Sequence, residues 1–406
     1  MLGIFSKIIS ILIVLLFSYQ LVYFLVALFG KEKTVSYEKK YHNYALLICA
    51  RNEELVIGDL LRSIQNQIYP KENYSTFVMA DNCTDATAKI AQANGAIVYE
   101  RSDLTHIGKG YALGALIKNI LGEYGDQFDG FIVFDADNVL TPDYLDQMNR
   151  TYCQGNRMIA SYINSKNYGS NWLSAGSSLF LLNKSRFLNR ARNILGLSAA
   201  ANGTGFLFSK DVLSDWPYHT LTEDIEFSVD QVCRRNRIAY CSSAVLYDEQ
   251  PTSFRQSYYQ RLRWAKGYLQ VMNKYFIPLV KGIGEGSFAC YDMLNTLLSG
   301  YGLSIFTITI NLFTFLYMLV TGVSIIPFIS SLALGLIRAY VLLCMVGLLT
   351  TITEWKRINA KPYHKIGYIF TYPLFIASYI PIAICALFIN VTWVPTKHSV
   401  STGAEH

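Results

Sequence analysis

Charged residues are scarce in this chain of 406 residues. Asp, Glu, Lys and Arg together make up 16% of the sequence, whereas hydrophobic residues make up 52%. Soluble globular domains usually contain about 25% charged residues. The composition excludes intrinsic disorder, a fibrous repeat and a small secreted module. Because the uncharged stretches lie at the two ends of the chain, we expect a water-soluble centre between apolar ends.

Several common sequence patterns are absent. The eight cysteines form no CxxC pair and no disulfide framework, which favours free thiols in a cytoplasmic domain. No GxGxxG follows the first predicted strand and no Walker A motif occurs, so a nicotinamide, flavin or P-loop site is not indicated. The net charge of +6 is dispersed and includes no basic block. That charge suits an anionic membrane surface and an anionic donor, and does not indicate a nucleic-acid partner.

The N-terminal apolar stretch is long enough to cross a bilayer. Residues 8–30 carry no charge, and a helix of this length spans a hydrocarbon core of about 30 Å. A cleaved signal peptide is the alternative, but no small-residue cleavage site follows. Instead, lysines follow at positions 31, 33, 39 and 40. We therefore expect residues 1–40 to form a retained transmembrane anchor.

The C-terminal part contains further apolar stretches. Residues 293–337 carry no charge and suffice for two crossings, the second running on past Arg338 to about residue 353. Another uncharged stretch covers residues 366–396. About three transmembrane helices are thus expected in 293–396, before a tail at 397–406. Arg338 would lie inside a span, where a charge either faces a pathway, here a polymer channel, or snorkels towards the interface.

Basic residues beside these stretches predict the orientation of the chain. Lysines follow the first stretch, and Lys356, Arg357, Lys361 and Lys365 separate the last two. Because basic residues flank spans on the cytoplasmic side, the central domain, residues 41–253, is expected in the cytoplasm. The chain is then an integral plasma-membrane protein.

Short apolar runs alternate with longer amphipathic runs in the first part of this domain. The pattern predicts strands at 44–49, 76–80, 97–99 and 130–134, and helices at 54–67, 84–94 and 109–121. Such alternation favours a parallel α/β sheet, in which ligands bind beyond the carboxyl ends of the strands. Residues 198–205 have the glycine content of a loop that approaches a ligand or a backbone closely.

Acidic residues follow two of these strands. Asp135 and Asp137 flank one alanine after the fourth strand and can reach a common point, where they would suit Mg²⁺ or Mn²⁺ bound through a substrate diphosphate. Asp81 follows the second strand and could contact a nucleotide. The alternative for both is an ordinary turn or helix cap, because Asp and Asn favour such positions.

Two later motifs carry further polar groups. In Thr222-Glu223-Asp224 the last acid is a candidate general base, although a threonine followed by acids also typifies a helix N-terminus. Gln260, Arg263 and Trp264 share one face of a predicted helix at 254–276. The helix as a whole has the composition of an interfacial helix, and residues 254–292 are assigned to that region. On the shared face, the indole could stack on a sugar and the guanidinium could hold a diphosphate.

Taken in order, these motifs resemble those of the membrane-integrated family 2 glycosyltransferases, which include cellulose, hyaluronan, chitin and poly-N-acetylglucosamine synthases. The resemblance covers about residues 44–270. It implies an α/β GT-A (Rossmann-like) catalytic domain on the cytoplasmic membrane face plus an α-helical transmembrane region. It also implies an inverting reaction, a UDP-sugar donor and a divalent metal, Mg²⁺ or Mn²⁺.

The resemblance also implies roles for individual residues. The donor-binding residues would be Ala50, Arg51, Asn52, Glu53, Asp81, Lys109, Asp135, Gln260 and Arg263. Asp137, with Asp135, would hold the metal; Asp224, with Glu223, would be catalytic; Trp264, Gly203, Thr204 and Gly205 would meet the acceptor. Trp393-Val-Pro-Thr396-Lys397 is similar to the ending of some synthases and would place the tail in the cytoplasm. Four simple crossings would leave it outside, so one apolar segment is expected to be re-entrant or interfacial.

The functional expectation is a processive enzyme that polymerises a β-linked polysaccharide from a UDP-sugar, UDP-glucose before UDP-N-acetylglucosamine, and exports it through its own helices. Its partners would be the donor, a growing glycan and the lipid bilayer, without nucleic acid. One alternative is the transfer of a single sugar to a membrane lipid acceptor. Another is a non-catalytic scaffold of an export complex, which the complete set of acids disfavours.

Overall fold

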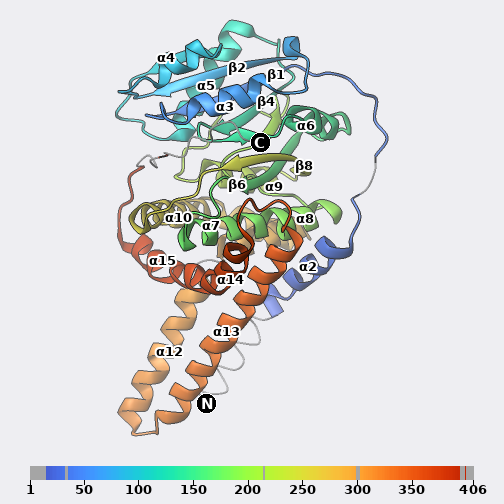
Figure 1. The fold of residues 1–406 in the computed structure, drawn as a ribbon. Coiled ribbons are helices and arrows are strands. Elements are labelled where there is room, and N and C mark those ends of the chain that lie inside the picture. The colour runs from blue at the N-terminus through green and yellow to red at the C-terminus, as the bar shows by residue number, and fades with distance from the viewer. Residues whose placement is uncertain (1–14, 33–34, 214, 299–301, 394–397, 399–406) are drawn as a thin grey trace.

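The chain forms an α/β domain, a layer of helices beneath it and a protruding helical hairpin (Figure 1). The computed structural model describes residues 15–32, 35–213, 215–298, 302–393 and 398. The sheet lies farthest from the hairpin, and long helices of the layer run beneath it. This arrangement puts one end of the sheet directly above apolar helices.

A sheet of eight strands forms the centre of the domain, in the order β3-β2-β1-β4-β7-β6-β8-β5. The strands are β1 Tyr44–Ala50, β2 Tyr74–Asp81, β3 Ile97–Arg101, β4 Gly130–Asp135, β5 Val139–Leu140, β6 Met158–Ser165, β7 Phe206–Ser209 and β8 Ala239–Asp248. The first four predicted strands are confirmed and pair in parallel. The sheet as a whole is mixed, because β7 runs antiparallel to β4 and β6.

Helices cover both faces of this sheet. Along β1, Ala45 and Leu47 pack into one apolar cluster while Leu46 and Ile48 pack into the other, as the two-residue period of a strand requires. The first cluster is completed by α5 Lys109–Tyr124, α7 Trp172–Asn183 and α9 Glu223–Cys233. The second is completed by α3 Ile57–Gln65, α4 Thr87–Ala93 and α6 Tyr144–Cys153. Both faces of β1 are therefore buried, which explains its unbroken apolar sequence.

The layer beneath the sheet begins with α7. Its helix continues without a break through a π-helical segment, Lys184–Asn189, into α8 Arg190–Ile194. The predicted helix at 254–276 is longer than expected: α10 runs from Phe254 to Gly284, and α11 Phe288–Leu298 packs against it. Single-turn π-helical segments occur frequently at functional sites.

The apolar helices are α2 Tyr19–Phe29, α12 Gly302–Thr321, α13 Ile326–Thr353, α14 Pro362–Ala377 and α15 Tyr379–Phe388. Two stretches are long and apolar enough to cross a membrane, 326–353 and 362–388. In the most apolar part of the first stretch 6% of the residues are buried, whereas in that of the second stretch 44% are buried. Figure 1 shows α14 and α15 folded up under the domain, while α12 and α13 protrude. The expectation that one apolar segment is re-entrant or interfacial stays a prediction.

Two predictions about the apolar ends gain no support from the described residues. The predicted N-terminal span begins at residue 8, and its first part lies outside them. Arg338 is exposed on the protruding α13. It is not among the residues that line the large cavity described below, so its proposed position in a polymer channel gains no support.

A buried ion pair joins α2 to α8 and α11. The carboxylate of Asp292 accepts hydrogen bonds from Arg192 Nε at 2.7 Å and from the hydroxyls of Tyr19 and Tyr23, both at 2.9 Å. The side chains of Arg192 and Asp292 are 3% and 2% exposed. The N-terminal apolar helix α2 is thus fixed to α11 by hydrogen bonds to a buried carboxylate and not only by packing.

Replacing Asp292 by alanine is expected to destabilise the protein by about 3–5 kcal/mol, because the Arg192 guanidinium would remain buried without its counter-ion. Thermal unfolding of the purified protein measures the effect. The matched control is Glu285→Ala, which removes a surface pair with Arg235 whose side chains are 54% and 43% exposed. We expect about 0–1 kcal/mol there. Equal losses in the two variants would contradict the role of the buried pair.

Candidate active site

A cavity of about 800 Å³ opens beyond the carboxyl ends of β1, β2, β4 and β8. It is lined by most of the side chains predicted for the site: Ala50, Arg51, Glu53, Asp81, Lys109, Asp135, Asp137, Gly203, Thr204, Glu223, Asp224, Gln260, Arg263 and Trp264. The topology explains this convergence, since parallel strands end at the same edge of a sheet. Residues separated by more than 200 positions in sequence thus meet in one space.

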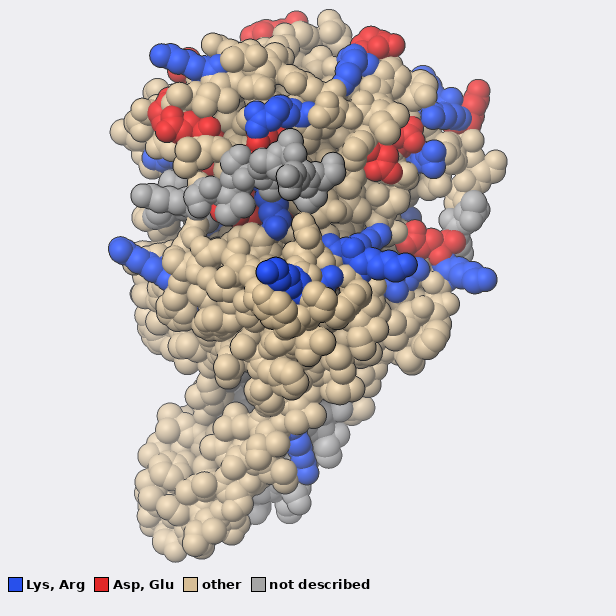
Figure 2. Space-filling view, in the orientation of Figure 1, with Lys and Arg blue, Asp and Glu red and all other residues tan. Residues whose placement is uncertain are grey.

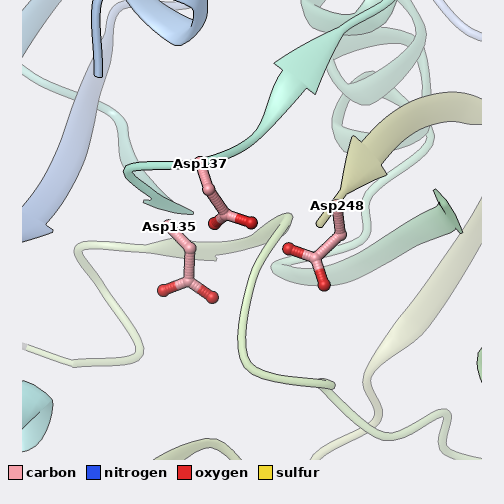
Figure 3. A group of neighbouring side chains, drawn as sticks. All are labelled: Asp135, Asp137 and Asp248. Atoms are coloured by element: carbon pink, nitrogen blue, oxygen red, sulfur yellow. The ribbon is translucent and has the colours of Figure 1, made fainter. Parts of the chain in front are cut away.

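Three carboxylates form the polar centre of the cavity. Oxygens of Asp135, Asp137 and Asp248 all lie within 4.8 Å of one another, and the three side chains point to a common place (Figure 3). Asp135 ends β4 and Asp248 ends β8. Oxygen ligands in this number suit Mg²⁺ or Mn²⁺. The sequence predicted the first two acids and missed Asp248, for which the only signal was an acid at the end of a strand.

Neighbouring groups hold these carboxylates in place. Asn138 Nδ2 donates to Asp248 at 2.9 Å, and the backbone N–H of Glu249 donates to Asp137 at 2.9 Å. Burial, with the charges of Asp137 and Asp135, raises the pKa of Asp248 well above its usual range. Buried carboxylates that repel one another are stabilised by a cation between them, so the residues present fit a divalent metal.

Lys109 reaches the same acids from the start of α5. Its Nζ forms an ion pair with Asp135 and donates to the backbone carbonyl of Gly203 at 2.7 Å. Burial acts to lower the pKa of this ammonium, but Asp135 and Glu223 outweigh it, so the pKa is raised. Lys109 therefore stays charged beside the metal-ligating acids and ties them to the loop at 198–205.

Within that loop, the predicted acceptor residues have different surroundings. Thr204 donates its hydroxyl to Asn138 and accepts from the backbone N–H of Asp135 at 3.0 Å. Its side chain thus fixes the Asp135 loop. Gly205 does not line the cavity: at a φ of 64°, its Cα is packed against Ser161 and Leu246, where a larger side chain has no room. Gly205 thus packs within the domain, and its contact with an acceptor stays a prediction.

Glu223 and Asp224 begin α9 and are buried, with 5% and 9% of their surfaces exposed. Burial and the neighbouring charge of Asp224 raise the pKa of Glu223 to about 7. Burial also raises the pKa of Asp224. Carboxylates with raised pKa values in a cavity are candidates for proton transfer near neutral pH.

The alternative interpretation, a helix N-terminus, is confirmed in position, because Glu223 and Asp224 lie in the first turn of α9. Thr222 occupies the N-cap position, but its side chain makes no capping hydrogen bond. The acid that stabilises the chain here is Glu226, which accepts from the backbone N–H groups of His219 and Thr220 and pairs with Lys274 at 2.6 Å. Glu226 therefore has the structural role, which leaves Glu223 and Asp224 facing the cavity.

One face of α10 closes the cavity from below. Gln260, Arg263 and Trp264 all line it, as their helical spacing predicts. Arg263 Nη1 donates to the backbone carbonyl of Leu221 at 3.2 Å, which places the guanidinium beside the start of α9. A fixed guanidinium, an indole and an amide thus border the two acids.

Asp81 and Asn52 differ in their positions. Asp81 lines the cavity and accepts from Arg101 Nη1 at 2.6 Å. Asn52, also predicted at the donor, is not among the lining residues: it has a φ of 58°, and its side chain accepts from the backbone N–H of Thr84 at 2.8 Å. Asn52 therefore joins the loops after β1 and β2, and only its neighbours Arg51 and Glu53 reach the cavity.

Two residues near the C-terminus also line the cavity, Trp393 and His398. Arg51 lies 5.5 Å from the centre of the Trp393 ring, and His398 Nδ1 lies 3.0 Å from Glu53. Burial opposes protonation of His398, but Asp137 and Glu53 raise its pKa to about 10. His398 thus lies at the cavity beside Glu53, while Thr396, Lys397 and the rest of the predicted tail fall outside the described residues. No sequence motif pointed to His398.

The opposite end of the same cavity is apolar. Leu336, Ala339 and Leu343 of α13 and Leu374 and Ile376 of α14 line it, together with Phe180 and Leu181 of α7. In Figure 1, α7 and α14 lie beneath the sheet, and α13 runs from this layer into the protruding hairpin. The cavity therefore joins a cluster of acids to apolar helices.

Comparisons with known proteins agree with this geometry. Residues 42–267 match the model of the family described as glycosyltransferase like family 2. The chain is 26% identical over 270 residues to a β-monoglucosyldiacylglycerol synthase of Nostoc sp., with 63% of this chain and 55% of the relative covered. It is 24% identical over 253 residues to the poly-β-1,6-N-acetyl-D-glucosamine synthase of Staphylococcus epidermidis, covering 61% and 59%. The chain thus matches little more than half the length of these relatives.

The fold resembles a mannosyltransferase of Pyrobaculum calidifontis solved with GDP-mannose and Mn²⁺. The TM-score is 0.55 at 13% identity, with 94% of this chain and 99% of the other covered. That likeness concerns the fold. The family match covers more than half of the chain and includes every acid of the cavity described above. The chain is a glycosyltransferase of GT-A-like fold and belongs to glycosyltransferase family 2.

Proposed function

We propose that the chain is an inverting, membrane-bound glycosyltransferase that transfers one sugar from a UDP-sugar to a hydroxyl group of a lipid. The observation that carries this proposal is the continuity of the cavity from the acids at the sheet edge to the apolar side chains of α13 and α14. An amphiphilic acceptor has a polar part that suits the end of the cavity with the acids and an apolar part that suits the end lined by α13 and α14. Among the relatives, the β-monoglucosyldiacylglycerol synthase is named for such a product.

The side chains divide the reaction between them. Asp224 takes the proton of the acceptor hydroxyl as its oxygen forms a bond to the anomeric carbon, and the bond from that carbon to the diphosphate breaks with its electron pair on the leaving group. Arg263 and Lys109 balance the charge of the diphosphate. Asp135, Asp137 and Asp248 would hold a divalent cation, which supplies further positive charge to the leaving group. Attack opposite the leaving group inverts the anomeric centre.

The surface of the chain supports a location at the cytoplasmic face of the plasma membrane. The protruding hairpin carries almost no charge, and basic side chains gather on the helical layer above it (Figure 2). Apolar residues of α12 and α13 such as Leu312, Phe313 and Leu336 are more than half exposed. In a bilayer this surface would be buried in lipid, with the basic residues at the headgroups.

A second candidate is processive synthesis of a β-linked polysaccharide. It is favoured by Gln260, Arg263 and Trp264, which line the cavity where an acceptor sugar could stack. A relative named as a poly-N-acetylglucosamine synthase supports it too. A non-catalytic scaffold has no such support, since the complete set of acids is assembled in one site.

Incorporation of labelled sugar by purified protein separates the two candidates. UDP-glucose and UDP-N-acetylglucosamine are offered separately, with Mg²⁺ or Mn²⁺ and mixed membrane lipids. Label in a lipid-extractable product of defined mass is expected. Label in high-molecular-weight material that a linkage-specific glycanase digests would overturn single transfer and establish the polymer instead.

A further inference from the structure

Lys184 is a cation of the cavity that forms no ion pair with any described residue. Five Lys and Arg side chains line the cavity: Arg51, Lys109, Lys184, Arg192 and Arg263. Lys109 and Arg192 form ion pairs, Arg263 bonds a carbonyl, and Arg51 lies over the Trp393 ring. In the part of the chain that the structure describes, Lys184 Nζ has neither a hydrogen bond nor an ion pair. Its Nζ lies 5.3 Å from the centre of the Phe180 ring.

Lys184 lies on the helix that runs between the acidic end and the apolar end of the cavity. It follows α7 and is the first residue of the π-helical segment Lys184–Asn189. In Figure 1, α7 lies between the sheet, which carries the acids, and the apolar helices α13 and α14. The acid whose charge acts most strongly on Lys184 is Asp224. Phe180 and Leu188, which lie close to it in sequence, line the cavity with apolar surface.

An ammonium in such surroundings is poorly stabilised. Burial lowers the pKa of Lys184 to about 8, with Asp224 acting to raise it and Arg192 to lower it further. Asp224 cannot serve as a permanent partner, because a general base must accept a proton in each turnover. An anionic group of a ligand, placed at Lys184, would supply the missing charge-assisted hydrogen bond.

We propose that Lys184 binds an anionic group of the acceptor, so that the acceptor is an acidic lipid with a free hydroxyl. This proposal rests on the lipid transfer proposed above. The hydroxyl lies at Asp224, the charged group at Lys184, and the hydrocarbon chains along α13 and α14. The anion is a carboxylate or a phosphate, since both accept from an ammonium.

A pair of lipids that differ in one group tests the proposal. Glucuronosyldiacylglycerol has a carboxylate where glucosyldiacylglycerol has a neutral hydroxymethyl group, and phosphatidylglycerol supplies the phosphate arm. We expect kcat/KM of the wild type to be about 10- to 100-fold higher for an acidic lipid than for glucosyldiacylglycerol. The better of the two acidic lipids identifies the anion.

Variants assign this preference to one side chain. In Lys184→Gln the ratio of kcat/KM for acidic and neutral lipid is expected to fall to about one, through a higher KM for the acidic lipid. Lys184→Arg keeps the charge, so most of the preference for the acidic lipid is expected to remain. The matched control is Lys118→Gln on the exposed face of α5, where the ratio stays as in the wild type. Because the readout is a ratio within each variant, loss of folded protein does not affect it.

Three outcomes would overturn the assignment: equal use of acidic and neutral lipids by the wild type, an unchanged ratio in Lys184→Gln, or a change confined to the pH dependence of kcat. The last would mean that Lys184 acts on Asp224 and not on the acceptor. Failure of the underlying function looks different. The wild type would then form no lipid product from any of the three lipids, while still releasing UDP or making polymer.

Discussion

Asparagine in place of Asp224 is expected to reduce the rate of sugar transfer by about 10²- to 10⁴-fold, the usual contribution of a general base. The substitution preserves shape and removes the site that accepts the proton. Binding of UDP should remain within a few-fold of the wild type, because the metal-ligating acids and Lys109 are untouched. Turnover with labelled donor and calorimetric titration with UDP measure the two quantities separately. Unchanged turnover would refute the assignment of Asp224.

The pH dependence of wild-type activity also tests whether a carboxylate acts as the base. A base must be deprotonated to work, so activity rises with pH through the apparent pKa values of the Glu223 and Asp224 pair. Because burial raises both pKa values, and the charge of Asp224 helps to raise that of Glu223 to about 7, the acidic limb of the profile is expected closer to pH 7 than to pH 4. Ordinary surface carboxylates would place it near pH 4.

Glu223→Gln serves as the matched control for that profile. Removing a negative neighbour lowers the pKa of the remaining carboxylate, so the acidic limb should move to lower pH. If Asp224 is the base, this variant keeps a base and loses less activity than Asp224→Asn. A limb that stays in place would show that the two carboxylates do not titrate together.

Much of this site could be predicted from local sequence, for a physical reason. Strands buried on both faces are continuous apolar runs, and the acids after them must gather at the edge where parallel strands end. Asp81, Asp135 and Asp137 were therefore predictable from position alone. The face of Gln260, Arg263 and Trp264 followed from helical spacing, which needs no knowledge of the fold.

Other features depend on contacts between distant segments. Asp248 joins the acids only because β8 pairs with β6 in parallel, and the polar residues of β8 gave no clear strand pattern. The antiparallel strand β7 inside the sheet also depends on distant partners. Lys184 lies in a helix without a motif, and only the packing of α7 against α13 and α14 places it in the cavity. Local patterns contain none of this information.

Asp248→Asn is the second variant for which we expect a large effect. The substitution removes one negative charge from the three carboxylates and with it a ligand for the cation. The concentration of Mn²⁺ or Mg²⁺ that gives half-maximal activity should rise by at least about 10- to 100-fold, as even the loss of an outer-shell partner produces changes of this size. Titration of activity with each metal measures the shift, and removal of metal by a chelator should abolish transfer in the wild type.

Asp126→Asn provides the comparison, because this side chain is 93% exposed, and neither it nor its partner Lys210 lines the cavity. Its metal dependence should match the wild type. If Asp248→Asn also matched the wild type, the cation would be held by Asp135 and Asp137 alone. The raised pKa of Asp248 would then reflect a carboxyl group that stays protonated beside two charged neighbours and accepts no metal.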